Sequence, residues 1–179
     1  TQGYSSAASD VYKRQTILST ALLLFLDQIA KYLAVLHLKG QATIPIIKNV
    51  FELQYLENQG AAFGIMQGKK TFFVIGTLIF LVIVVILYHN IPLTKRFTPI
   101  RIVAVLIVAG AIGNMIDRVV HQYVIDFFYF KLINFPIFNV ADIYVVVACI
   151  LFILLMLFYY KEEELGQIFP FMKNKKAEE

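Results

Sequence analysis

Residues 138–160 read FNVADIYVVVACILFILLMLFYY, an apolar run of membrane-spanning length with an acidic side chain, Asp142, near its start. Shortly before it, residues 112–130 read IGNMIDRVVHQYVIDFFYF, where Arg118 and Asp126 follow another apolar run. An ionisable side chain costs at least about 2.5 kcal/mol near the centre of a membrane helix, so such residues are candidates for function. The two stretches predict that polar chemistry gathers where two membrane helices reach the same side of a bilayer.

The composition is that of a membrane protein. The chain has 179 residues, of which 59% are hydrophobic and only 16% are charged, and its mean hydropathy is +0.72. Charged residues make up about a quarter of a typical soluble domain. The net charge of +4 does not indicate a nucleic-acid partner, because the sequence has no Lys/Arg-rich stripe; the excess fits membrane flanks instead.

A helix that crosses a bilayer needs about 20 mostly apolar residues. Four segments qualify, at about residues 16–36, 71–88, 100–116 and 140–160. Residues 1–15 are polar and Ser/Ala-rich, and we expect a disordered tail or a sequence artefact there. Residues 161–179 are expected to form a cytoplasmic tail.

The connection at residues 37–70 differs from the other loops. It contains strand-forming residues, from Ile44 to Leu56, that are punctuated by Pro45 and Asn49. We expect a small sheet there, followed by a short helix on the outer membrane surface. The predicted fold class is therefore an all-α membrane protein with four transmembrane helices, a small extracytoplasmic β-containing subdomain and a short interfacial helix.

Basic residues predict the orientation of the bundle. If both termini are cytoplasmic, the inner side carries nine Lys and Arg residues and the outer side carries six. The positive-inside rule predicts an excess of Lys and Arg on the cytoplasmic side, so this count supports the orientation with cytoplasmic termini.

Elimination leaves carboxylates as the chemical groups. The serines lie at positions 5, 6, 9 and 19, far from the polar groups of the third and fourth spans. Cys149 lies in mid-span, where we expect a small buried hydrophobe rather than a nucleophile. The three histidines are isolated and no H-E-x-x-H motif occurs, so neither a zinc site nor any other metal or cofactor is expected.

Topology brings two of the carboxylates together. The third span ends on the outer side, the fourth span begins there, and Asp126 lies in the loop between them. Asp126 and Asp142 are thus able to converge near the outer interface. Two carboxyl groups at so short a distance cannot both ionise, and they share one proton. One then acts as base on a water molecule while the other acts as acid.

Structural roles are open alternatives for these residues when each is taken alone. Asp142 has the position of a first-turn helix residue, with Asn139 as the N-cap. Asp126 has the position of a solvated loop residue. Asp27 and Lys31 have the i, i+4 spacing of a pair that neutralises itself.

Five motifs, in order and over about residues 16–160, resemble those of bacterial lipoprotein signal peptidase, also called signal peptidase II, an intramembrane aspartic protease. They are LDQIAKYL (26–33), NQGAAFG (58–64), GNMIDR (113–118), VIDFF (124–128) and FNVAD (138–142).

The resemblance implies roles for individual residues. Asp126 and Asp142 match the catalytic dyad. The residues that match the substrate- and inhibitor-binding site are Asn58, Gly60, Asn114, Arg118 and Asn139. Those assigned to structural support are Asp27, Lys31 and Asp117.

The resemblance also implies the reaction and its location. The family removes the signal peptide from diacylglyceryl-modified prolipoproteins, cutting just before the lipidated cysteine, and globomycin inhibits it at the same site. We therefore expect a multi-pass protein of the bacterial cytoplasmic membrane, with both termini cytoplasmic and the active site at the outer face. We expect a monomer in contact with membrane lipid.

A proton- or ion-coupled transporter is the alternative from another class. Its relay would use the Asp, Lys and Arg residues within the spans. A relay needs ionisable groups in the inner half of the membrane, and spans two to four offer only Arg101 there.

Overall fold

The computed structural model describes residues 2–60 and 68–169. In that part of the chain, four helices are long and apolar enough to cross a membrane. They are α1 (Gln2–Leu38), α2 (Lys70–Asn90), α3 (Thr98–Val120) and α4 (Val140–Leu154). Their membrane-spanning parts cover Asp10–Leu38, Lys70–Asn90, Lys95–Val120 and Val140–Tyr159. The four predicted spans are confirmed, and α3 is about one turn longer at its C-terminal end than expected.

Shorter elements complete the chain. The 3₁₀ turns η2 (Lys95–Phe97) and η3 (Lys131–Ile133) precede α3 and follow the last strand. The π-helix η4 (Leu155–Tyr159) continues α4, and the short helix α5 (Glu162–Ile168) follows it. Residues 162–168 were expected to be part of a tail, but an ion pair of Glu164 with Arg96, with Nε and Oε1 at 2.9 Å, ties α5 to η2 just before α3.

The N-terminal segment differs from its prediction. We expected residues 1–15 to be a disordered tail, whereas α1 begins at Gln2 and runs without a break into the first span. Alanine, lysine and arginine in this segment favour helix, and a helix already formed in the membrane extends at little cost.

A three-stranded antiparallel sheet lies beyond the membrane helices. Its strands β1 (Ile44–Ile47), β2 (Phe51–Asn58) and β3 (Val124–Tyr129) are ordered β1-β2-β3. The small sheet predicted in the connection at residues 37–70 is confirmed, with β1 and β2 pairing as a hairpin. The turn between them contains Asn49 with a φ of 62°, a left-handed conformation that asparagine tolerates. β3 was predicted as a loop. The expected interfacial helix falls on residues 61–67, outside the described residues.

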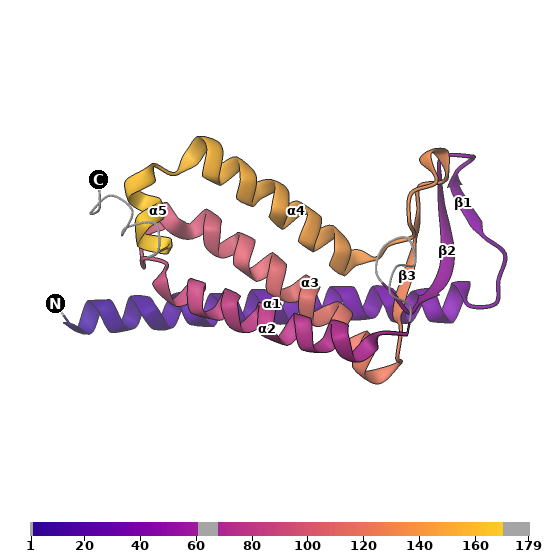
Figure 1. The fold of residues 1–179 in the computed structure, drawn as a ribbon, viewed down its shortest axis with the longest axis horizontal. Coiled ribbons are helices and arrows are strands. Elements are labelled where there is room, and N and C mark those ends of the chain that lie inside the picture. Colours follow the sequence, from indigo (N-terminus) through magenta and orange to yellow (C-terminus); the bar gives the residue numbers. More distant parts are fainter. Residues whose placement is uncertain (1, 61–67, 170–179) are drawn as a thin grey trace.

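The elements are arranged from one end of the bundle to the other (Figure 1). The start of α1 and α5 lie at one end, and the sheet lies at the opposite end. Helix α3 packs against α1, α2 and α4, whereas α2 buries none of its residues. An apolar α2 that faces outward is what a lipid environment allows.

Two glycines bring α3 close to its neighbours. A Cβ at Gly110 would lie 2.6 Å from the carbonyl oxygen of Ala141 of α4, and one at Gly113 would lie 2.5 Å from a carboxylate oxygen of Asp27 of α1. Small residues allow such close helix approach in membranes. Because Ala141 precedes Asp142, this packing sets the position of the carboxylate at the start of α4.

Candidate active site

Strand β3 carries Asp126 into the protein interior. Asp126 pairs with Leu56 of β2, and Asn58 lies two residues further along the same face of β2. This diagonal position is within reach across an antiparallel pair, and the Asn58 amide donates to Asp126 Oδ2 at 2.8 Å. Asp126 is only 2% exposed, so the alternative of a solvated loop residue is wrong.

The start of α4 holds the second carboxylate. Asn139 is the N-cap of α4, and its side chain accepts from the backbone N–H of Asp142 at 3.0 Å. Asp142 Oδ2 in turn accepts from the backbone N–H of Asn139 at 3.1 Å. These two bonds form a capping box, as expected from the alternative in which Asp142 is a helix-start residue. The capping box does not use the other carboxylate oxygen of Asp142, Oδ1.

Two asparagines connect the carboxylates. Asn114 of α3 donates to Asp142 Oδ1 at 2.8 Å, and Asn139 donates to Asp126 Oδ1 at 2.7 Å. Asn139 also donates to Asn114 Oδ1 at 3.0 Å. Asn139 therefore contacts both acids, one through its side chain and the other through its backbone, and fixes their relative position.

The chain between the two acids folds back on itself. Phe128 donates to and accepts from Phe138 through backbone bonds of 2.9 and 3.0 Å, so the segment after β3 returns alongside it. Residue 139 thereby comes next to residue 126 although 13 positions separate them.

Burial changes the acidity of Asp126. Removal from water, reinforced by the negative charge of Asp142, raises the pKa of the Asp126 carboxyl to about 7, against the opposing effect of the amides of Asn58 and Asn139. Desolvation and a like charge both disfavour the ionised form of a carboxylic acid. Asp126 is thus able to carry a proton near neutral pH, which an ordinary aspartic acid does not.

Arg118 lies beside the pair without bonding to it. Its guanidinium donates to the carbonyl oxygens of Asn114 and Gly60, both at 3.3 Å, and lies over the ring of Phe73 at 4.8 Å. Gly60 in turn donates its N–H to Asn58 Oδ1 at 3.0 Å. Arg118 therefore connects α3 to the segment that carries Asn58.

A buried ion cluster supports the two acids from behind. Lys31 of α1 lies 2.9 Å from Asp27 and 3.0 Å from Asp117, and all three side chains are at most 2% exposed. Asp27 Oδ1 accepts from the N–H of Ala141 at 2.9 Å, and Asp117 Oδ2 accepts from the N–H of Ile125 at 3.1 Å. Each of these acids thus holds the backbone next to one of the two candidate catalytic residues.

The sequence predicts the pair of Asp27 and Lys31 but not the further members of the cluster. Lys31 also donates to Asn114 Oδ1 at 3.0 Å, and Gln28 donates to Asp27 and Asp117 at 3.1 and 3.2 Å. The signal was present, because Gln28 is a polar residue inside an apolar run, next to Asp27.

A cavity of about 520 Å³ opens beside the two acids. Its polar end is formed by six of the predicted site residues, namely Asn58, Gly60, Asn114, Arg118, Asp126 and Asp142. The rest of its wall is apolar and comes from the segment around Phe138 and from one face of α4 that includes Ile143 and Val146. Such a cavity suits a ligand that has a polar centre and a long apolar part.

Comparison with known proteins identifies the family. The sequence matches the family described as signal peptidase (SPase) II over residues 19–158. The chain belongs to this family. It is therefore a protease of signal peptidase II type, a multi-pass membrane enzyme, and the aspartic type agrees with the family.

Individual relatives cover most of the chain. The lipoprotein signal peptidase of Caldanaerobacter subterraneus subsp. tengcongensis is 44% identical over 136 residues, which are 75% of this chain and 90% of that protein. The lipoprotein signal peptidase of Streptococcus pyogenes serotype M5 is 39% identical over 154 residues, which are 86% of this chain and 98% of that protein.

Solved structures share the fold. A bacterial membrane enzyme determined at 2.3 Å is 33% identical, with a TM-score of 0.71, over 80% of this chain and 87% of that one. A second bacterial membrane enzyme, determined at 1.9 Å, is 32% identical, with a TM-score of 0.69, over 82% of this chain and 94% of that one. The signal peptidase II fold predicted from the motifs is confirmed.

The predicted site residues of the signal peptidase II motifs lie together in one region of the structure. Most of the NQGAAFG motif, residues 61–64, lies outside the described residues. Cys149 was expected to be buried, but it is exposed on α4, because that face of the helix is directed toward lipid rather than toward a neighbouring helix.

Proposed function

We propose that Asp126 and Asp142 form the catalytic dyad, and that it removes the signal peptide from diacylglyceryl-modified prolipoproteins just before the lipidated cysteine. The proposal rests on the contacts of Asn139. Its side chain donates to Asp126 and its backbone N–H donates to Asp142, so that the two carboxyl groups are held at one end of the cavity. The names of the relatives, which are lipoprotein signal peptidases, support the choice of substrate.

The reaction follows from one proton shared by two acids. The ionised carboxylate takes a proton from a water molecule, and the resulting hydroxide attacks the carbonyl carbon of the scissile peptide bond. The protonated carboxyl donates to the carbonyl oxygen, giving a neutral tetrahedral intermediate. The dyad then gives its proton to the leaving nitrogen, and one hydroxyl of the intermediate returns a proton to the dyad as the C–N bond breaks, so that the dyad again holds one proton. The raised pKa of Asp126 supports a protonated partner at neutral pH.

Substrate binding uses the two parts of the cavity. The amides of Asn58 and Asn114 and the guanidinium of Arg118 lie at its polar end, where they suit a peptide backbone. The apolar wall along α4, with Ile143 and Val146, suits the acyl chains or the apolar signal sequence. Globomycin would occupy the same cavity.

The orientation in the membrane is part of the proposal. The start of α1 and α5 lie at one end of the bundle, and the dyad lies near the sheet at the other end (Figure 1). With nine basic residues on the terminal side against six on the other, we place the termini in the cytoplasm and the dyad at the outer face. A monomer suffices, because one chain supplies the dyad and the asparagines that hold it.

A cleavage assay on a lipidated prolipoprotein with the purified protein tests the proposal. Asp126→Asn and Asp142→Asn should each abolish cleavage while the melting temperature shows a folded protein. Asp10→Asn, an exposed acid on α1, is the matched control and should keep full activity. The effects of the two variants should be strongly non-additive, since the pair works as a unit.

More than a few per cent of activity in either variant would remove that residue from the dyad. The wild-type reaction should stop with globomycin. The transporter alternative has no support in the family match or in the named relatives, which are signal peptidases.

A further inference from the structure

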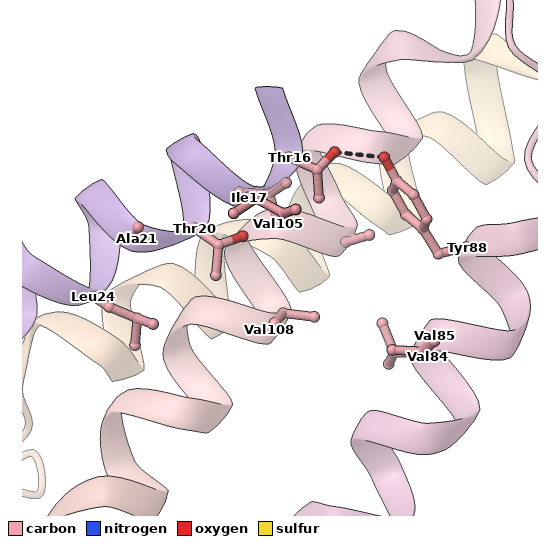
Figure 2. A pocket seen from close by; sticks show the side chains of 11 residues that line it. Thr16, Ile17, Thr20, Ala21, Leu24, Val84, Val85, Tyr88, Val105 and Val108 are labelled. Carbon is pink, nitrogen blue, oxygen red and sulfur yellow. Dashed lines mark hydrogen bonds between the residues drawn. The ribbon is translucent and has the colours of Figure 1, made fainter. Parts of the chain in front are cut away.

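A second cavity lies between α1, α2 and α3, in the half of the bundle away from the sheet (Figure 2). Its volume is about 400 Å³, enough for roughly a dozen groups of the size of a water molecule at ~30 Å³ each. In Figure 2, side chains of α1 and α3 line one side and side chains of α2 line the other. We call it the α1–α2 groove.

The α1–α2 groove offers hydrocarbon rather than polar groups. Thr16 and Tyr88, at the end of the groove nearer the termini, form a hydrogen bond of 2.5 Å between their hydroxyl oxygens, so they satisfy each other. Among the lining residues, Thr20 carries the one other polar side chain, and Leu24, Val84 and the remaining ones are apolar. A ligand that needs hydrogen bonds along its length does not fit such a lining, whereas an alkyl chain does.

The groove opens sideways toward the membrane. Ile17 and Val85, which line it on α1 and α2, are 69% and 51% exposed. The lining lies within the membrane-spanning parts of the three helices. An empty groove would forfeit dispersion contacts along its walls, and the chains within reach at this depth are the acyl chains of the surrounding lipid.

Basic side chains stand at the end of the groove that faces the terminal side of the bundle. Lys13 lies four residues before Ile17, His89 lies four residues after Val85, and Arg101 lies four residues before Val105. Residues four apart share a helix face, so each of the three lining helices places one basic residue in line with the groove.

Arg101 has no carboxylate partner within residues 2–60 and 68–169. Its guanidinium donates to the backbone carbonyls of Ile91, Pro92 and Thr94 and lies 4.4 Å from the ring centre of Tyr12. Arg101 is buried, so it adds positive charge behind the groove rather than a free donor. Helix α5 carries three glutamates at the same end of the bundle, and Asp10 lies nearly a turn further from the groove than Lys13. The positive charge that the groove end offers is therefore the local charge of the exposed Lys13.

We propose that the α1–α2 groove binds one anionic phospholipid, with an acyl chain along Thr20 and Val108 and the phosphate beside the exposed Lys13. The apolar lining selects the chain, and the basic end selects the negative headgroup. In the orientation proposed above, this lipid comes from the cytoplasmic leaflet. The groove is separate from the dyad cavity, since the two share no lining residue.

Native mass spectrometry of the purified full-length chain tests headgroup selection. After detergent delipidation, the protein is titrated with phosphatidylglycerol or with phosphatidylcholine of the same acyl chains. The wild type should bind one phosphatidylglycerol per chain in preference to phosphatidylcholine. Lys13→Gln should weaken the binding of phosphatidylglycerol about fivefold, the effect of one basic residue near a charged headgroup, and leave phosphatidylcholine unchanged. Lys69→Gln, the same charge change at the sheet end of α2, is the control and should have no effect.

A second variant tests the acyl-chain site itself. Ala21 lines the groove, and Ala21→Phe should fill it and abolish one-to-one binding of either lipid. Leu22→Phe, on the neighbouring exposed position of α1, is the matched control and should bind as the wild type does. If Ala21→Phe fails to fold, as judged from its melting temperature, the Lys13→Gln titration decides alone.

Three results would overturn the proposal. Equal binding of the two lipids by the wild type, unaffected by Lys13→Gln, would remove the anionic headgroup from it. Unchanged one-to-one binding in a folded Ala21→Phe would remove the groove. Displacement of the bound lipid by a lipidated prolipoprotein, with crosslinking of its signal sequence to the groove, would assign the groove to substrate. All these readouts measure binding, so loss of the proposed cleavage activity would not affect them.

Discussion

Protonation of a single residue, Asp126, connects the structure to a pH profile. Burial and the nearby charge of Asp142 raise the pKa of Asp126 to about 7. If cleavage requires one proton on the dyad, kcat/KM should fall about tenfold per pH unit above pH 7 as this proton is lost. The measurement is kcat/KM of the purified enzyme between pH 5 and pH 9. A rate that stays constant up to pH 9 would show that the proton is not needed.

The same raised pKa predicts how stability depends on pH. The ionised form of Asp126 is disfavoured in the folded protein, so its cost is absent below pH 4, grows up to about pH 7 and then levels off. Asp126→Asn removes this cost. The variant should therefore gain melting temperature over the wild type at pH 8, with a smaller gain at pH 5. An equal difference at both pH values would contradict the raised pKa.

Arg118 predicts a binding effect rather than a pH effect. Its guanidinium holds two backbone carbonyls, those of Asn114 and Gly60, and makes no hydrogen bond to either acid of the dyad. Arg118→Lys keeps the charge but loses the planar fork of donors, so the segment that carries Asn58 loses its attachment. KM for the prolipoprotein and the Kd of globomycin should rise several-fold, while the pH optimum stays in place. A shift of the optimum by a unit with unchanged binding would show that Arg118 tunes the dyad directly.

At the scale of elements, the contact between α3 and α4 determines where Asp142 lies. A Cβ at Gly110 would lie 2.6 Å from the backbone oxygen of Ala141 and 2.7 Å from a methyl carbon of Val145. Since a backbone atom cannot move alone, Gly110→Ala should push α4 away from α3. We expect a loss of about 1–3 kcal/mol in stability, the usual cost of overpacking, and a larger than tenfold loss of cleavage.

Gly76→Ala is the control for this prediction. Gly76 lies in α2, and a Cβ there would meet no atom within 4 Å. The control should fold and cleave as the wild type does, or become slightly more stable, because alanine favours helix over glycine by about 1 kcal/mol. A Gly110→Ala variant that matches Gly76→Ala in activity would show that the helix contact does not position the dyad.

At the scale of the whole molecule, one buried cation connects elements that are far apart in sequence. Lys31 of α1 bonds to Asp117 and Asn114 of α3, and through Asp27 and Asp117 the cluster holds the start of α4 and strand β3. Lys31→Met would leave two buried carboxylates without a counter-charge, which costs about 3–5 kcal/mol. The melting temperature in detergent should fall strongly, and cleavage should fall with it.

A variant with a neutral cluster provides the control for Lys31. In the triple variant Asp27→Asn, Lys31→Met, Asp117→Asn, no charge is left unpaired, so part of the lost melting temperature should return. If the triple variant is no more stable than Lys31→Met alone, the charge of the cluster is not what Lys31 balances.

The number of spans and the family follow from the amino-acid sequence alone. Apolar length is a local property, and a lipid environment makes it decisive because a helix satisfies its own backbone groups. The small sheet in the connection at residues 37–70 was also predicted, from strand-forming residues around Asn49. The motifs predicted the proposed dyad residues and the asparagines around them, since each motif keeps its residue types close together along the chain.

How these residues meet depends on the folding of the whole chain. Strand β3 was predicted as a loop because its partner β2 is separated from it along the chain by two membrane spans, and because polar and apolar residues do not alternate in VIDFFY. The β-branched and aromatic residues of VIDFFY were the signal for a strand. The bonds of Asp27 to Ala141 and of Asp117 to Ile125 use backbone groups, which no side-chain pattern reveals. The raised pKa of Asp126 likewise depends on burial and on the nearby charge of Asp142. The physical reason is the same in each case: these interactions join segments whose proximity is set by packing, and packing is a property of the whole bundle rather than of any segment in it.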